Sequence, residues 1–264
     1  PSTLGVRLKA KTAVVAVAFP SNLFGSLDER ASRVDCDNAA IGSAGARHFL
    51  SLGTFNSFGF VHTRSESGDV RERGFRETLQ DKGRSCQVFE TAFPRDDSDW
   101  EDMAGWLRKL SKPAAVMAFY DEQACRVLRV CRAEGIRVPQ EVSVIGVDND
   151  ELLCESATPT LSSIEPDHEA VGFAAAEELA RRFRRPSAKG QTIDVGRPQV
   201  VERESTAPVA PGTHLVQKAL TYIEKHACDG IGVPDVVRFL AVSRRLIDRR
   251  FSAATGTSIH RAIE

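Results

Sequence analysis

Three segments of the sequence place charged or amide side chains beside apolar stretches. They are Arg33–Asn38, Arg71–Phe75 and Val144–Asp150. Carboxylates and an arginine suit a neutral sugar, because each can bridge two neighbouring hydroxyls through charge-assisted hydrogen bonds. Each acidic residue taken alone could instead cap a helix or occupy a turn, since aspartate favours both positions.

Other chemistries lack their sequence signatures. The chain has no phosphate-binding loop, no dinucleotide-binding glycine pattern, no nucleophile elbow and no HExxH motif. The six histidines show no metal spacing, and no two of the six cysteines form a CxxC pair. Scattered cysteines of this kind indicate reduced thiols in a cytoplasmic protein. We therefore predict no catalytic residue, no metal site and no cofactor.

The composition indicates a soluble globular chain of roughly two domains. Of its 264 residues, 42% are hydrophobic and 27% are charged, and no apolar run suits a membrane helix. The net charge is −1, yet residues 213–264 contain eight Lys or Arg against five Asp or Glu. A basic C-terminal part could meet an anion or could simply be a solvated helical face. Because the chain begins with Pro1, we expect it to be a piece of a longer protein.

Apolar runs alternate with amphipathic stretches along most of the chain. The runs at 12–19, 58–61, 114–119 and 142–147 predict buried strands. The stretches at 41–50, 71–79, 100–110, 122–134 and 168–183 predict helices, and the third should bury Trp100 and Trp106. In the last helix, we expect one apolar stripe of Val171, Ala175, Leu179 and Phe183. This alternation predicts an α/β fold of parallel sheets flanked by helices.

The C-terminal part has a different pattern. Residues 205–212, with two prolines, one glycine and no charge, predict a linker between a domain at 1–204 and a domain at 213–264. Three short helices follow, with a tight turn at Ala241–Val242 and Ser243 as the N-cap of the third. The spacing is typical of an all-α helix-turn-helix domain.

Residues 12–205 resemble the sugar-sensing domain of the lac-repressor/GalR family, a type I periplasmic-binding-protein-like fold with two lobes. The resemblance is carried by Gly42, Gly74-Phe75 and the runs 120–121, 135–139, 142–148 and 160–164. It implies that the effector is held by Asp37, Arg71 and Asp148, with Tyr120 and Asp121 beside them. The family often has Asn where this chain has Tyr120, which could lay its ring against a sugar face. The resemblance also implies that the N-terminal part of the sensor is missing here.

Residues 213–264 resemble the first half of an AraC-type DNA-binding domain. The matching segments are 219–223, 233–237, 242–243, 249–251 and 256–259. The resemblance implies a DNA-contacting helix that begins at Ser243. Arg245, Asp248 and Arg249 would face bases, and Arg244 would face phosphates. An arginine can bridge O6 and N7 of guanine, and Asp248 could accept from cytosine or orient a neighbouring arginine.

A sensor of the first type followed by an AraC-type domain is the arrangement of the xylose-operon regulators. Residues 144–154 and 226–243 resemble those proteins. The resemblance implies a dimeric transcription activator that binds operator DNA, responds to xylose and meets RNA polymerase. A regulator of another sugar, a transport-type sugar-binding protein and a sugar-modifying enzyme stay open as alternatives.

Overall fold

The computed structural model describes residues 12–17, 31–63, 65–91, 98–185, 188–207, 213–226 and 230–263. The chain divides into two compact units, residues 1–207 and residues 208–264. The predicted linker at 205–212 is therefore wrong at its start. Ser205 and Thr206 lie in a short 3-10 helix, η2 (Glu204–Thr206), and both are buried in the first unit. Residues 208–212 of that prediction lie outside the described residues.

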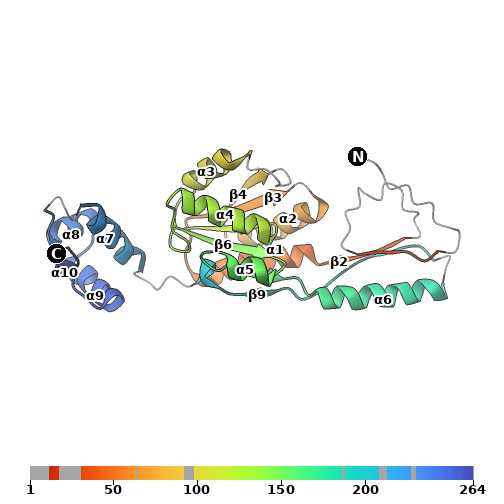
Figure 1. Cartoon of the computed structure of the whole chain (residues 1–264). Coiled ribbons are helices and arrows are strands. Elements are labelled where there is room, and N and C mark those ends of the chain that lie inside the picture. Colours follow the sequence, from red (N-terminus) through yellow and green to blue (C-terminus); the bar gives the residue numbers. More distant parts are fainter. Residues whose placement is uncertain are drawn as a thin grey trace. The chain divides into compact units, whose positions relative to one another are not determined.

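The first unit contains two sheets (Figure 1). In the smaller sheet, all strand pairs are parallel, and the order is β1 (Val15–Val17), β2 (Ser32–Cys36), β8 (Thr192–Val195). In the larger sheet, the order is β4 (Cys86–Thr91), β3 (Ser57–Thr63), β5 (Ala114–Ala118), β6 (Val142–Val147), β7 (Ser162–Glu165), β9 (Gln199–Val201). Its strands pair in parallel except β9, which runs antiparallel to β7.

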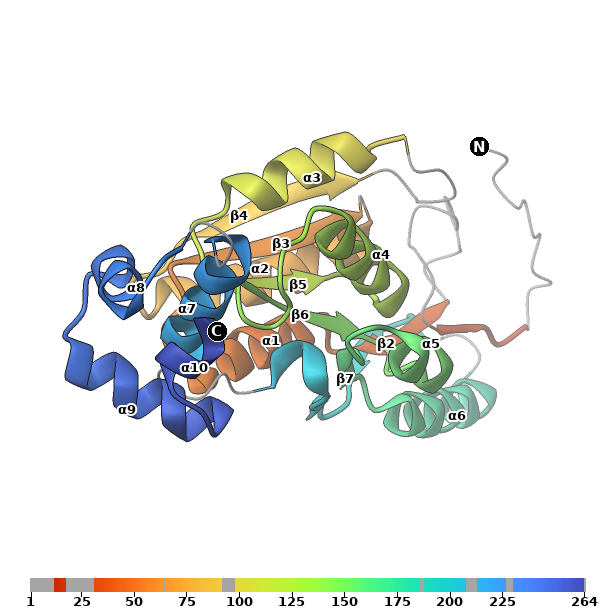
Figure 2. The ribbon, with the colours of Figure 1, turned by 60° about the vertical axis from the view of Figure 1, so that its left-hand side comes forward.

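Helices cover both faces of the larger sheet, as Figure 2 shows. They are α1 (Asn38–Leu52), α2 (Glu66–Gln80), α3 (Trp100–Lys109), α4 (Asp121–Ala133) and α5 (Glu151–Ser156). Successive residues of β5 face opposite sides, since Ala115 and Met117 pack with α1 and α2 while Ala114 and Val116 pack with α3 and α4. Burial on both faces explains why this strand is a continuous apolar run. The predicted mostly parallel α/β fold is confirmed.

The chain crosses between the two sheets three times. The crossings follow β2, β7 and β8, at residues 37, 166–167 and 196–198. Three adjacent crossings give the unit two lobes joined by short segments, which is the architecture expected from the sequence. The sites at which the strands end and the crossings begin are therefore close together.

The helix that covers the smaller sheet, α6 (His168–Arg184), corrects one prediction. Val171 is buried, but Phe183 at the end of the expected stripe is 68% exposed. Glu178 and Arg182 are buried instead, and Ser32 of β2 donates a hydrogen bond to Glu178. The sequence pattern missed this orientation because a buried carboxylate with polar partners looks like a surface residue in sequence. The predicted strand at 12–19 is confirmed only at Val15–Val17, and residues 18 and 19 lie outside the described residues.

The second unit is all-α in its described residues, with α7 (Thr213–His226), α8 (Val233–Leu240), α9 (Arg244–Thr255) and α10 (Ile259–Ile263). The three helices expected from the sequence are present, and they share a core that includes Val236, Ile247 and Phe251. Ala241 takes φ 53° in the tight turn, and Ser243 is the N-cap of α9 but makes no side-chain capping bond. None of the helices in the described parts of the chain is long and apolar enough to span a membrane.

Candidate functional site

The chemistry-bearing residues of the first unit gather where strands end. Phe119 and Tyr120 follow β5, Asp148 follows β6, and Asp37 follows β2. β5 and β6 are parallel neighbours, so their carboxyl ends lie at one edge of the larger sheet. Ligands of open α/β sheets bind at such an edge, next to the crossings between lobes.

Arg71 of α2 is the centre of this group and is only 6% exposed. Its Nε and Nη2 donate to Oδ1 of Asn38 at 3.2 and 2.8 Å, and its Nη1 donates to the carbonyl oxygen of Phe119. The guanidinium lies 4.5 Å from the centre of the Phe119 ring, within reach of a cation–π interaction. Burial lowers the pKa of Arg71, and the nearby negative charge of Asp148 opposes that shift. Four contacts with the protein's own groups thus hold the guanidinium in place.

Two glycines allow Arg71 to reach Asn38. A side chain at Gly42 of α1 would meet the backbone oxygen of Arg71 at 2.0 Å, and one at Gly74 of α2 would meet the backbone oxygen of Ala39 at 2.3 Å. The two helices therefore approach more closely than any residue with a Cβ would permit. Both glycines belong to the sequence motifs of the expected sensor family, and their role here is to bring α1 and α2 together.

Asp148 is exposed and has an unusual backbone, with φ 102°. The next residue, Asn149, also has a positive φ, 52°. Non-glycine residues in this region are strained and cluster at functional sites. Surrounding protein atoms raise the pKa of the Asp148 carboxyl, whereas the positive charges of Arg71 and His168 lower it. Arg71 and Asp148 thus lie close enough to influence each other, as expected for one site.

Asp37 is the N-cap of α1, a structural role that aspartate often takes. Its Oδ1 accepts a hydrogen bond from the backbone N of Ala40 at 2.8 Å and so caps α1. Asn38, the next residue, makes the contact to Arg71. Asp37 therefore lies beside the group around Arg71 but uses one carboxylate oxygen to hold the start of α1. Its role toward a ligand stays a prediction.

Asp121 is buried, at 2% exposure, and its carboxylate is hydrogen-bonded within the protein, while its role toward a ligand stays a prediction. Ser163 donates to its Oδ1 at 2.6 Å, and the backbone N of Asp150 donates to its Oδ2 at 2.8 Å. Burial raises the pKa of Asp121 to about 6, against the lowering effect of these bonds. Its carboxylate fixes the loop that carries Asp148. The sequence could not separate these roles, because an aspartate after a strand suits both.

Tyr120 precedes α4 and packs edge-on against Phe119, with 5.5 Å between ring centres. Burial raises the pKa of its hydroxyl to about 12, so it is a neutral phenol at physiological pH. The two rings and Arg71 form an aromatic and cationic wall at the end of β5. Such a wall suits the apolar face of a sugar ring, and Asp148 and Arg71 offer partners for hydroxyl groups.

Two residues of this group lie outside the segments selected from the sequence, and a third, Asn38, lies inside one but was not predicted as a ligand contact. Asn38 and Phe119 contact Arg71 directly, and His168 lies 4.0 Å, Nδ1 to Sγ, from Cys36 at the end of β2. Asn38 could have been found as the residue adjoining Asp37, but Phe119 and His168 carry no local signal. Among the residues that the structure describes, no three His, Cys, Asp or Glu side chains are placed to hold a metal ion.

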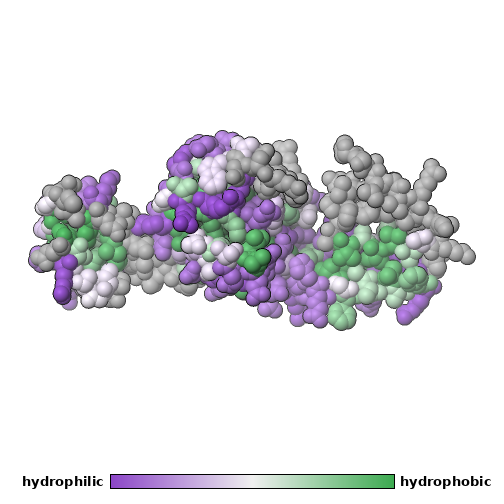
Figure 3. Space-filling view, viewed as in Figure 1, coloured by the Kyte–Doolittle hydropathy of each residue, from purple (hydrophilic) through white to green (hydrophobic). Residues whose placement is uncertain are grey.

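An apolar hollow of about 390 Å³ lies elsewhere in this unit, between β1 and α6. Its lining side chains are all alanine, valine or leucine: Ala13, Val14, Val15, Val17, Ala175, Ala176 and Leu179. Figure 3 shows the corresponding hydrophobic surface over α6. With no polar side chain in its lining, the hollow does not suit a sugar.

The second unit presents a set of charged residues along α9. Arg244, Arg245 and Arg249 are exposed, while Ile247 and Phe251 on the opposite side are buried. Arg244 and Asp248 form an ion pair at 3.4 Å. The helix α9 thus has a core face and a charged face, and its contact with DNA stays a prediction.

Comparison with known proteins identifies the fold of the first unit. The family model described as a periplasmic binding protein-like domain matches residues 46–206. The chain belongs to the periplasmic binding protein-like family. The matched span of this domain includes Arg71, Asp148 and all six strands of the larger sheet.

Relatives extend the likeness beyond the periplasmic binding protein-like domain. Over 234 residues, 86% of this chain, the sequence is 32% identical to the "Xylose operon regulatory protein" of Escherichia coli K12, of which it covers 59%. It is 27% identical to the protein of that name from Haemophilus influenzae Rd, of which it covers 60%. A solved structure of the "xylose-binding transcription activator xylR" matches 95% of the chain with a TM-score of 0.69 and 28% identity, and 67% of that structure is covered. The predicted resemblance to xylose-operon regulators is confirmed, over about three fifths of those proteins' length.

Proposed function

We propose that this chain is the sugar-sensing part, with the start of the DNA-binding part, of a transcription activator that responds to xylose. The arrangement of Arg71, Asn38, Phe119 and Asp148 at the crossings between two lobes carries the proposal. It offers two charged hydrogen-bonding groups and an aromatic wall to a neutral polyol. The 32% identity with the Escherichia coli xylose operon regulatory protein supports xylose as the sugar.

In this mechanism, the sugar binds between the lobes, with hydroxyl groups on Asp148 and Arg71 and its ring against Phe119 and Tyr120. Asp37 contributes its second carboxylate oxygen. The sugar favours one arrangement of the lobes because only there can it contact both. The change in DNA binding then depends on the difference in sugar affinity between the two arrangements.

The DNA-contacting helix of the proposal is α9. Arg245 and Arg249 face bases, Arg244 contacts phosphate, and Asp248 orients Arg244, which is supported by their ion pair at 3.4 Å. Ser243 begins the helix and places these side chains. The remainder of the proposal is an AraC-type unit in a cytoplasmic homodimer that recruits RNA polymerase and has no enzymatic activity.

Calorimetry of the full-length protein with xylose, arabinose, ribose and glucose tests the sensor role. We expect xylose to bind with the highest affinity of the four. No heat with any of them would reject the sensor, and tighter binding of another sugar would replace xylose as the effector. Incubation with the same sugars, followed by product analysis, tests the enzyme alternative, for which accumulation of a converted sugar would be the evidence.

A further inference from the structure

The last segment of the first unit is folded onto the strands of the candidate site. Ser205 and Thr206 of η2 are 0% and 1% exposed. The Oγ of Ser205 donates to the carbonyl oxygen of Val144 in β6 at 2.6 Å, and Thr206 bonds to Ser162 of β7 at 2.7 Å. η2 ends two residues before residue 208, where the second unit begins. We call the chain that leads from η2 into the second unit the connector, and η2 its root. This root is therefore anchored to β6 and β7.

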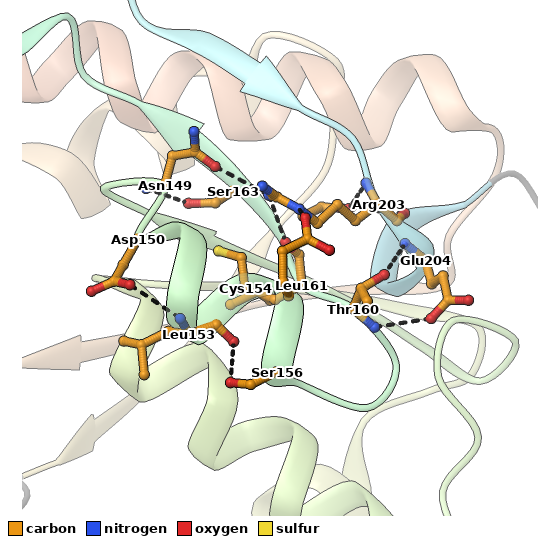
Figure 4. A network of polar contacts seen from close by, with 12 residues as sticks. Asn149, Asp150, Leu153, Cys154, Ser156, Thr160, Leu161, Ser163, Arg203 and Glu204 are labelled. Atoms are coloured by element: carbon orange, nitrogen blue, oxygen red, sulfur yellow. Dashed lines mark hydrogen bonds and ion pairs between the residues drawn. The ribbon is translucent and has the colours of Figure 1, made fainter.

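Arg203, just before η2, joins this root to the loop of Asp148 (Figure 4). Its Nη1 donates to Oδ1 of Asn149 at 3.1 Å and to the carbonyl oxygen of Leu161 at 3.0 Å. Its Nε donates to Glu155 at 2.6 Å. The Arg203 side chain is only 12% exposed. The planar guanidinium reaches these three acceptors from two nitrogens, whereas a lysine would have to reach all three from a single nitrogen.

The loop that Arg203 contacts is the strained one. Asp148 and Asn149 both have positive φ, and Asn149 is also held by its backbone N bonding to Oγ of Ser163 at 3.0 Å. Asp150 is held by Asp121. The bonds to Ser163 and Asp121 attach the loop to buried residues of the first unit. The bond to Arg203 attaches it instead to the residue that precedes η2.

We propose that Arg203 is the positioning residue that couples the effector loop Asp148–Asp150 to the connector through η2. The inference rests on the proposed function, which it deepens by naming its route of regulation. A sugar that binds Asp148 fixes the conformation of Asn149. Asn149 in turn fixes Arg203, and Arg203 fixes the first residue of η2. The sugar therefore stabilises the root of the connector only while this guanidinium is present.

Hydrogen exchange of the full-length protein tests this route at three amides. The amides of Ser205, Thr206 and Ala207 donate to Thr160, Arg203 and Glu204, so their exchange rates report how firmly η2 is held. In the wild type, we expect saturating xylose, or whichever of the four sugars binds most tightly, to slow their exchange about fivefold or more. In Arg203→Gln, we expect the sugar to slow them less than about twofold, while sugar affinity stays within about threefold of wild type.

A matched control is Arg132→Gln, which removes an exposed arginine of α4 from the same unit. It should leave the wild-type response of η2 intact. Arg203→Lys keeps the charge but loses the planar fork, and it should behave as Arg203→Gln does. This second variant decides the matter if Arg203→Gln does not fold.

The outcomes separate this inference from the proposed function. If the wild type binds none of the four sugars, the proposed function fails before any variant is compared. If the wild type binds a sugar but η2 exchanges at an unchanged rate, the coupling through Arg203 is wrong and the sensor role survives. A normal η2 response in both Arg203 variants overturns the inference, and so does a loss of sugar affinity beyond about tenfold, which would place Arg203 in the binding site itself.

Discussion

The two units hold the charged residues of their candidate sites in opposite ways. In the first unit, Arg71 is 6% exposed and its guanidinium is fixed by Asn38 and Phe119. In the second unit, Arg244, Arg245 and Arg249 of α9 are exposed, and the ion pair between Arg244 and Asp248 is long, at 3.4 Å. One unit presents pre-arranged groups, and the other presents a charged surface.

The difference follows from the ligands that we propose. A neutral sugar offers no long-range attraction, so its site depends on hydrogen bonds whose geometry exists beforehand. DNA attracts cations over about a Debye length, and exposed arginines can adjust to phosphates and bases on contact. Substitutions in the first unit should therefore change sugar affinity and the pH dependence of stability. Substitutions of exposed arginines in the second unit should change DNA binding.

The largest effect should come from the core of the second unit. Phe251→Ala removes a ring that is 0% exposed, and should lower that unit's free energy of unfolding by about 3–5 kcal/mol. Phe239→Ala, at a position 53% exposed, is the matched control and should cost about 1 kcal/mol or less. Calorimetric unfolding with and without sugar separates the transitions, because only the sensor transition should rise with sugar. A fall of that sensor transition in Phe251→Ala would contradict the independence of the two cores.

Loss of the buried guanidinium should abolish sensing. Arg71→Met leaves Oδ1 of Asn38 and the carbonyl oxygen of Phe119 without their donor, and should weaken sugar binding about 100-fold or more. Arg76→Met on the same helix removes an exposed arginine paired with Glu72, and should leave affinity within about twofold. Calorimetric titration measures both. Equal effects of the two substitutions would show that pre-arrangement around Arg71 has no special importance.

A smaller effect should appear in the pH dependence of the first unit. The folded-state pKa of Asp121, about 6, lies above its ordinary value of 3.8, so ionisation is costly in the folded state. The contribution of Asp121 to the free energy of unfolding should therefore be fully present below about pH 4 and should be lost, by at most about 3 kcal/mol, as pH rises through 6. Asp121→Asn should remove this fall, whereas Asp81→Asn, at an exposed position, should retain it. Denaturant unfolding from pH 4 to 7 gives the answer, and an unchanged fall in Asp121→Asn would contradict the assignment.

The smallest effect should come from the exposed arginines. Arg245→Ala should weaken binding to a DNA fragment from upstream of the gene by about 1–3 kcal/mol and relax the preference at one base pair. Arg238→Ala, which removes a 78% exposed arginine from α8, should change binding by about 0.5 kcal/mol or less. Titrations against the fragment and a scrambled sequence at two salt concentrations compare them. A uniform loss on both sequences would make Arg245 a phosphate contact rather than a base contact.

Local patterns sufficed for much of the architecture. The Val- and Ala-rich runs of β5 and β6 gave the strand positions correctly, because burial on both faces requires continuous apolar residues. Amphipathic spacing located α1 to α4 within a few residues. It failed for α6, where buried Glu178 and Arg182 face the sheet and Phe183 is exposed. A polar group with internal hydrogen bonds is indistinguishable in sequence from one in solvent.

The sequence by itself determined which residues could form the site. Arg71 and Asp148 lie in two of the three polar segments, and the resemblance to the lac-repressor/GalR family singled them out. Tertiary structure alone decided their partners. It gave Asp121 to the protein's own hydrogen bonds, and it brought Asn38, Phe119 and Arg203 into the network. Hydrogen bonds act over about 3 Å, and the groups concerned are up to 54 positions apart in the chain. Only the packing of helices and strands brings them within that distance.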